Sequence, residues 1–242
     1  GYTVSLSTNG FMMQQIEPYP ERMYLEANCG PVIRRGTQHA NWELEYLVKE
    51  RGARLCKLYT PEDDGPLNDK RLWPFYEKAC ELNVPLTVHT GMSYVCPQPS
   101  RHCEVRQLDD VLLDFPDLRI IAYHAGWPQS EELIGLCGKH KNLYMSLSGI
   151  FGWYQRSPYR GYHVIGTALQ WVPADKIVLG FDLPFDDLPR VTDYIRDLSM
   201  PEELQEKWGY AQVTDEDKAK ILGLNLAKLT GIDPKKRIKR NK

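Results

Sequence analysis

The sequence predicts an α/β protein in which parallel strands alternate with helices and close into a barrel. Short apolar runs rich in β-branched residues recur along the 242 residues, and such runs are typical of strands buried on both faces. Helical stretches separate most of them, which implies parallel strands joined by right-handed crossovers. Three of the runs end in His89, His124 and Asp182, so we expect these polar side chains to meet at one rim of the sheet.

Seven runs have the character of strands, and their exit ends carry the polar residues. They are Tyr2–Ser7, Met23–Cys29, Ala53–Tyr59, Val84–His89, Arg119–His124, Leu143–Ser148 and Lys176–Asp182. A closed barrel of this kind needs eight strands. Because the chain begins at Gly1 and not at Met, we expect the first strand to be missing from it.

Amphipathic segments between the strands predict helices. Apolar residues on one face mark Asn41–Arg51, and Thr214 with the acidic residues after it begins a last helix that ends at Gly231. The other predicted helices are Asp69–Leu82, Leu108–Phe115, Glu131–Lys139 and Leu188–Leu198.

Strand–helix alternation also fits an open, doubly wound sheet, but the motifs favour the barrel. A doubly wound nucleotide-binding protein should carry a glycine-rich turn after an early strand, and the sequence contains neither G-x-G-x-x-G nor a Walker A motif. The candidate ligands lie on three separate strands, as in a barrel whose active site draws on many strand ends. We therefore predict one (β/α)8 TIM-type barrel domain over residues 1–242, with a basic, solvated tail at 235–242.

Composition limits the partners and the compartment. A formal net charge of −2 and an isoelectric point near 6.3 give no general attraction to nucleic acid or to an anionic membrane. No apolar run approaches the roughly 18 residues that a membrane span needs. The six cysteines contain no C-x-x-C pair, so we expect reduced thiols and a cytoplasmic protein with a small-molecule substrate.

The residue types at the strand ends suggest a metal centre. Two imidazoles and a carboxylate suit zinc first, and also manganese or iron. For a single histidine, a satisfied polar group at a strand end is the better interpretation. For His89 and His124 at equivalent strand exits, together with Asp182 before a proline turn, the functional interpretation is favoured.

Several segments share the motifs of a known family. These segments are Leu55–Tyr59, Thr87–Gly91, Phe115–Gly126, Leu179–Pro184 and Lys220–Leu229. In order and spacing they resemble the amidohydrolase-related family, metal-dependent barrels that include hydrolases and non-oxidative decarboxylases of the aminocarboxymuconate-semialdehyde and resorcylate type. The resemblance covers the chain from about residue 20 to residue 232.

The resemblance implies a role for each candidate residue. His89 would bind the metal, and His124 would be a second ligand or the general acid/base. Asp182 would bind the metal and accept a proton from its water, whose pKa a metal lowers to about 7. The chain departs from the family pattern because it has no H-x-H sequence, and Phe181 replaces the usual serine before the aspartate.

From this resemblance we expect a metal-dependent hydrolase that acts on a small carboxylated or cyclic molecule. Non-oxidative decarboxylation on the same scaffold is the first alternative. A non-catalytic barrel subunit without the first-strand ligands is the second. Lys57 at a strand end and Trp127 after the His124 turn are candidate substrate contacts, although solvent exposure of Lys57 and a rim anchor at Trp127 are the structural alternatives. Aromatic and arginine residues in the segment 150–162 suggest a lid or the contact of a homodimer.

Overall fold

Six parallel strands form the centre of the protein. The computed structural model describes residues 8–20, 22–95, 97–149, 157–182 and 187–235. The strands pair in the order in which they occur along the chain. They are β1 (Glu26–Asn28), β2 (Leu55–Leu58), β3 (Leu86–Val88), β4 (Ile120–Ala122), β5 (Leu143–Ser146) and β6 (Ile177–Val178).

The strand order confirms the predicted fold class. In a doubly wound sheet the order reverses at a switch point, whereas here each strand lies beside its sequence neighbours, as in a barrel. Within the part of the chain that the structure describes, β1 and β6 are the edges of this arc. Six of the seven predicted strands are confirmed with shorter bounds, and the seventh, Tyr2–Ser7, lies outside the described residues.

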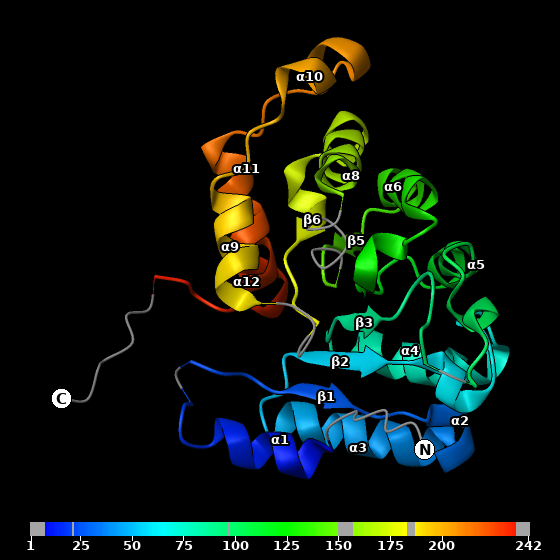
Figure 1. Ribbon diagram of the computed structural model, residues 1–242. Helices are drawn as coiled ribbons and strands as arrows, with labels where there is room; N and C mark the ends of the chain where they lie inside the picture. The colour runs from blue at the N-terminus through cyan, green and yellow to red at the C-terminus, as the bar shows by residue number, and fades with distance from the viewer. Residues whose placement is uncertain (1–7, 21, 96, 150–156, 183–186, 236–242) are drawn as a thin grey trace.

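Helices cover the outer face of the arc, and the C-terminal helices lie beside β6, except for the helix Glu202–Trp208, which lies near the end of the helix Pro158–Trp171 (Figure 1). The outer helices are α3 (Thr37–Lys49), α4 (Trp73–Glu81), α5 (Gln107–Asp114), α6 (Ser130–Lys139) and α8 (Pro158–Trp171). The C-terminal group comprises α9 (Leu188–Arg196), α10 (Glu202–Trp208), α11 (Asp215–Ala219), a π-helical turn (Lys220–Leu224) and α12 (Asn225–Thr230). Two short helices, α1 (Asn9–Ile16) and α2 (Val32–Arg35), flank β1. Single 3-10 turns are η1 (Thr60–Asp63), η2 (Lys70–Leu72), η3 (Ser100–Cys103), η4 (Tyr123–Gly126) and η5 (Ala174–Lys176).

The six helices predicted from amphipathic spacing are all present with small changes at their ends. The last one begins as expected, because the Thr214 side chain accepts the Asp217 amide in a capping box, and it ends at Gly231 with φ of 67°. Helix α8 was not predicted. Its first turn takes up the described part of the segment 150–162, for which a lid or a dimer contact was predicted.

Side chains of the strands alternate between two apolar layers. One face, with Ala27 and Cys56, packs in the large core beneath the outer helices. The other face forms a smaller cluster in which Ile121 and Val178 pack with Leu229 of α12. Along β1 and β2 the residues on this inner face, among them Glu26 and Lys57, are half-buried, whereas their neighbours in sequence are buried. The inner face therefore carries polar groups that the outer face excludes.

Two further expectations concern membranes and thiols. Among the residues that the structure describes, no helix is long and apolar enough to cross a bilayer. Among the described residues, Cys29, Cys56, Cys80, Cys103 and Cys137 form no disulfide.

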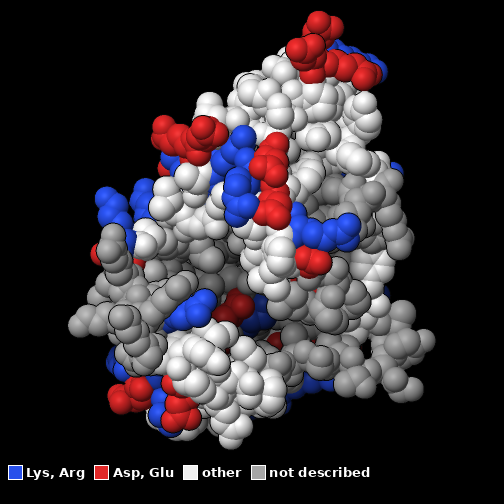
Figure 2. Space-filling model, turned by 60° about the vertical axis from the view of Figure 1, so that its left-hand side comes forward, with Lys and Arg blue, Asp and Glu red and all other residues white. Residues whose placement is uncertain are grey.

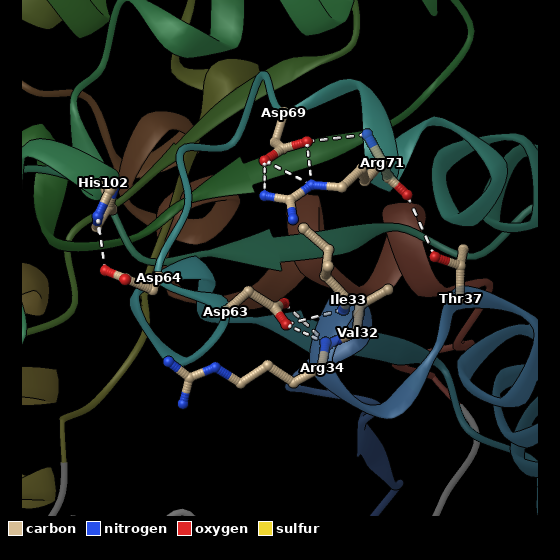
Figure 3. A network of polar contacts seen from close by, with 9 residues as sticks. All are labelled: Val32, Ile33, Arg34, Thr37, Asp63, Asp64, Asp69, Arg71 and His102. Atoms are coloured by element: carbon tan, nitrogen blue, oxygen red, sulfur yellow. Dashed lines mark hydrogen bonds and ion pairs between the residues drawn. The ribbon is translucent and has the colours of Figure 1, made fainter.

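A buried carboxylate fixes the segment that follows β1. Asp63 is only 6% exposed, and its oxygens accept the backbone N–H groups of Val32 and Ile33 at 2.8 Å and of Arg34 at 2.9 Å (Figure 3). These are the amide groups of the first turn of α2, which have no partner within the helix. The contact thus joins the turn after β2 to the turn after β1.

We predict that Asp63→Ala lowers the free energy of unfolding by about 3 kcal/mol, because three backbone N–H donors, one of them buried, lose a charged acceptor. Urea denaturation measures the change. The neighbouring Asp64→Asn is the control: the Asp64 side chain is 66% exposed, so its replacement should change stability by less than about 0.5 kcal/mol. Equal urea midpoints of unfolding for Asp63→Ala and Asp64→Asn would contradict the role given to Asp63.

Candidate functional site

Two histidines from neighbouring strands face each other at the exit ends of the sheet. His89 follows β3 and His124 lies in η4, directly after β4, and these strands are paired. The Nδ1 atom of His89 lies 3.0 Å from Nε2 of His124, and the ring centres are 4.5 Å apart. The structure therefore brings together two of the three predicted metal ligands.

The outer nitrogens of both rings face carbonyl groups. His124 Nδ1 lies 3.1 Å from the Ser148 carbonyl oxygen, and His89 Nε2 lies 3.3 Å from that of Met92. A carbonyl can only accept, so each outer nitrogen carries the proton. In neutral imidazoles with this tautomer both inner nitrogens present lone pairs to one another, and a cation between them would make the contact favourable.

A metal ion fits this position better than a proton does. Burial, with the neighbouring His124 and Lys57, lowers the pKa of His89 to about 2, so the ring stays neutral near pH 7. Metal-bound histidines in proteins usually donate their other N–H to a carbonyl or carboxylate, as these two do. Two nitrogens bound to one ion lie roughly 3.4 Å apart at a tetrahedral angle, which requires the rings to separate by only a few tenths of an ångström.

Asp182 and His124 both lie close to Gly149. A Cβ atom placed on Gly149 would be 2.9 Å from His124 Nδ1 and 3.1 Å from Asp182 Oδ2. Glycine at position 149 thus allows the imidazole and the carboxylate to approach the same backbone. Burial raises the pKa of Asp182, and the ammonium group of Lys57 opposes that shift.

The predicted third ligand, Asp182, is not close enough to His89 and His124 to bind the same ion in this structure. No group of three His, Cys, Asp or Glu side chains in the described ranges is close enough to bind one ion. Binding of a metal by His89 and His124 together with Asp182 therefore stays a prediction, for which the converging nitrogens supply the geometric support.

The loops that carry the two histidines are joined through their backbones. The Met92 amide donates to the Trp127 carbonyl at 2.7 Å, and Gly91 packs against Gly126 and Trp127. The substrate contact predicted for the Trp127 indole stays a prediction, but its backbone links the His89 loop to the His124 turn. His124 and Ala125 have left-handed backbone conformations, with φ of 61° and 44°, which are strained for residues other than glycine.

Lys57 lies inside the arc and its cation has an aromatic neighbour. Its Nζ atom is 3.7 Å from the centre of the Tyr123 ring, close enough for a cation–π contact. Burial lowers the pKa of Lys57 to about 8, although the charges of Glu26 and Asp182 act to raise it. The amine is therefore largely protonated near pH 7 and places a positive charge within reach of an anionic substrate.

Sequence reasoning did not identify Glu26, Thr87 and Tyr123 as site residues. The Tyr123 hydroxyl donates to Glu26 Oε1 at 2.9 Å, and the Thr87 hydroxyl donates to the same oxygen. A charged residue inside a short apolar strand was the available signal for Glu26. Figure 2 shows a hollow in the middle of the face turned to the viewer, in which acidic and basic side chains lie next to one another.

Known proteins share both the sequence pattern and the fold. The amidohydrolase family model matches residues 27–232. A 2-keto-4-carboxy-3-hexenedioate hydratase from Sphingobium sp. strain SYK-6 is 35% identical over 101 residues, which cover 35% of this chain and 29% of the hydratase. A gamma-resorcylate decarboxylase from Polaromonas sp. strain JS666 is 23% identical over an alignment of 253 positions, which covers 84% of this chain and 73% of that protein. The sequence match thus spans less than a third of the hydratase.

Two solved structures show the same fold at low identity. An uncharacterized TIM-barrel protein from Bordetella bronchiseptica superimposes with a TM-score of 0.72 at 20% identity, over 93% of this chain and 72% of that one. A dihydroxybenzoic acid decarboxylase from Polaromonas sp. JS666, with bound manganese and the inhibitor 2-nitroresorcinol, superimposes with a TM-score of 0.67 at 17% identity. The superposition covers 92% of this chain and 73% of that one. The family model spans most of the chain and agrees with the motifs around His89 and His124, so this chain belongs to the amidohydrolase family of enzymes.

Proposed function

We propose that the protein is a divalent-metal-dependent lyase that removes carbon dioxide from a small aromatic carboxylic acid, with a hydroxylated benzoate as the substrate class. The observation that carries this proposal is the pair of imidazoles whose facing nitrogens, His89 Nδ1 and His124 Nε2, lie 3.0 Å apart, on the same rim as the half-buried Lys57. The decarboxylase relative, which aligns with 84% of the chain, supports the reaction.

In this proposal His89, His124 and Asp182 hold the cation. When bound, the ion would orient the oxygen atoms of the substrate and withdraw electron density from them. Manganese is the proposed metal, supported by the solved dihydroxybenzoic acid decarboxylase. Zinc, the first expectation from the sequence, suits the same donor set.

The charges of the site favour a carboxylated substrate. Among the described residues, the basic group Lys57 lies near the charges of two acidic ones, Glu26 and Asp182. A divalent cation changes the sum of these charges from −1 to +1, and a monocarboxylate then brings it to zero. Buried sites favour such neutrality because unpaired charge costs several kcal/mol in a region of low dielectric constant.

Decarboxylation requires a proton at the carbon that loses carbon dioxide. We assign Asp182 Oδ2 as the group that passes a proton from solvent to this carbon, and Lys57 as the group that orients the carboxylate before it leaves.

Hydration of an unsaturated keto acid is the second candidate, because the hydratase relative is more similar in sequence over its shorter match. Hydrolysis, which the sequence favoured, would use the same residues. We rank it third, since the four proteins compared above are two decarboxylases, a hydratase and a protein without an assigned activity. Retention of the two imidazoles, Asp182 and Lys57 argues against a non-catalytic subunit.

The test of the reaction is an assay with γ-resorcylate and the manganese-loaded protein. We expect formation of resorcinol and carbon dioxide in equal amounts, measured by liquid chromatography and by gas analysis. His124→Asn should lower the rate by more than about 100-fold, since it removes one cation ligand. A metal-loaded protein that releases carbon dioxide from neither γ-resorcylate nor related hydroxybenzoates would contradict the proposal.

We also propose that the protein is cytoplasmic and that it forms a homodimer. The free thiols of the five described cysteines support a cytoplasmic protein. A homodimer is supported by exposed aromatic side chains on α8, since Tyr159 is 51% and Trp171 74% exposed.

A further inference from the structure

Tyr59 contacts the His89 imidazole from the neighbouring strand. It directly follows β2, which pairs with β3, and His89 directly follows β3. The ring centres of Tyr59 and His89 lie 5.2 Å apart and the two planes meet at 73°, an edge-to-face arrangement that aromatic pairs favour. Tyr59 is only 6% exposed, so its own ring is held by its surroundings and limits the rotation of the His89 ring.

The hydroxyl group of Tyr59 contacts the loop after β3. Its oxygen lies 2.7 Å from Ser93 Oγ in a buried hydrogen bond. Ser93 is 8% exposed, whereas the side chain of Met92, the residue before it, is 40% exposed. The Ser93 side chain, and not that of Met92, therefore anchors this part of the loop in the interior.

The same part of the loop carries the acceptor for the His89 proton. His89 Nε2 lies 3.3 Å from the Met92 carbonyl oxygen. This carbonyl and the Ser93 amide belong to one planar peptide group, and the Ser93 amide donates to Ser100 Oγ at 3.1 Å. The position of Ser93 therefore sets the direction of the Met92 carbonyl. Tyr59 thus contacts the His89 ring with its own ring and the residue beside the acceptor with its hydroxyl.

The Met92 carbonyl decides which nitrogen of His89 is available to a cation. A neutral imidazole has one proton, and a hydrogen bond at one nitrogen fixes that proton and leaves the other nitrogen with a lone pair. With the proton on Nε2, the Nδ1 atom can bind a cation. With the proton on Nδ1, the ring would instead donate to His124 Nε2, 3.0 Å away, and both facing nitrogens would be closed to the ion.

We propose that Tyr59 is a positioning residue that holds the Met92 carbonyl against His89 Nε2 and so keeps Nδ1 of that ring unprotonated for the metal ion. Ser93 is the link between the Tyr59 hydroxyl and that carbonyl. The inference deepens the proposed function and rests on it, since it takes His89 as a ligand. Tyr59 does not bind the ion and acts by selecting the tautomer of a residue that does.

NMR spectra of the metal-free protein test the tautomer directly. Long-range correlations between ring protons and ring nitrogens distinguish the two tautomers, and His89→Ala identifies the signals of this ring. We expect the Nε2–H form in the wild type and a mixture of both forms in Tyr59→Phe, which keeps the ring and loses the hydroxyl. A wild type with the proton on Nδ1, or the same tautomer in both proteins, would overturn the inference.

Calorimetric titration with Mn²⁺ alone measures the effect on metal binding. We expect Tyr59→Phe and Ser93→Ala each to raise the Kd about tenfold, within the range measured for groups that act on a metal through its ligands. Because both changes remove the same hydrogen bond, the double variant should match either single one within about twofold. A clear further rise in the double variant, or an unchanged Kd in either single one, would contradict the role. If Tyr59→Phe does not fold, Ser93→Ala takes its place in both measurements.

Tyr76→Phe is the matched control for a merely structural effect. The buried Tyr76 hydroxyl on α4 donates to the Leu67 carbonyl at 2.6 Å. Its loss should lower the urea midpoint of unfolding, as Tyr59→Phe does, but leave the manganese Kd and the His89 tautomer unchanged. An equal rise in Kd for Tyr76→Phe and Tyr59→Phe would show that any lost buried hydroxyl bond loosens the site, and the inference would be wrong.

Failure of this inference can be distinguished from failure of the proposed function. A wild-type chain that binds no manganese would contradict the proposed function. The tautomer of His89 in the metal-free wild type and in Tyr59→Phe would still decide the role of Tyr59.

Discussion

Gly91→Ala is expected to lower the free energy of unfolding by at least about 3 kcal/mol. A Cβ atom at this position would lie 2.0 Å from the Trp127 carbonyl oxygen and 2.7 Å from the Gly126 carbonyl carbon. Both neighbours are backbone atoms, so no side chain can rotate away to make room. The residue also has φ of 81°, a conformation that residues with a Cβ atom adopt at a cost.

The loop with Gly91 and the turn with Trp127 cannot move apart to make room for a Cβ atom without losing backbone hydrogen bonds. The Gly91 amide donates to the Cys103 carbonyl and the Met92 amide to the Trp127 carbonyl, both at 2.7 Å. Separation of the backbones would break these bonds and would carry His89 away from His124. Gly91→Ala should therefore impair metal binding even where the chain still folds.

Urea denaturation measures the stability of Gly91→Ala, and Gly135→Ala is the matched control. Gly135 lies in α6, and a Cβ atom there would meet nothing within 4 Å. Alanine is favoured over glycine inside a helix by about 1 kcal/mol, so this control should be slightly more stable than the wild type. A Gly91→Ala protein as stable as the wild type would show that the two loops do not pack as described.

His89→Ala and Asp182→Asn are each expected to remove most of the bound metal, with a fall in affinity of more than about 100-fold. His89→Ala deletes one of the two converging nitrogens, and Asp182→Asn replaces a charged ligand with a neutral amide. Elemental analysis of the purified variants measures the metal per chain. Circular dichroism should show that both variants fold, because neither side chain belongs to the apolar core.

His39→Ala is the control for these two variants. His39 lies exposed on α3, away from the strand ends, so its loss should leave the metal content unchanged. Wild-type metal content in both His89→Ala and Asp182→Asn would refute the assignment of the site.

The exit ends of the strands were the most predictable part of the protein. Each strand is a short apolar run with a polar residue after it, and parallel neighbours place such residues at one edge. His89 and His124 therefore came into contact as expected. Asp182 was less predictable, because it lies four positions beyond the last residue of β6, where backbone geometry and not strand pairing sets its position.

Contacts between distant segments could not be derived from local patterns. Glu26 reaches Tyr123, 97 positions away, only because the sheet curves and brings β1 near the end of β4. Asp63 accepts amides some 30 positions earlier, which depends on how two turns pack. The left-handed backbone of His124 depends on a contact with a distant segment, since both its amide and its Nδ1 atom face Ser148.

The most direct test of the site is anomalous diffraction from crystals of the manganese-loaded protein. The account predicts one peak per chain between His89 Nδ1 and His124 Nε2, with the Asp182 carboxylate as a further ligand and the outer nitrogens still facing the carbonyls of Met92 and Ser148. Crystals in which the two imidazoles stay in direct contact and manganese binds elsewhere or not at all would contradict it.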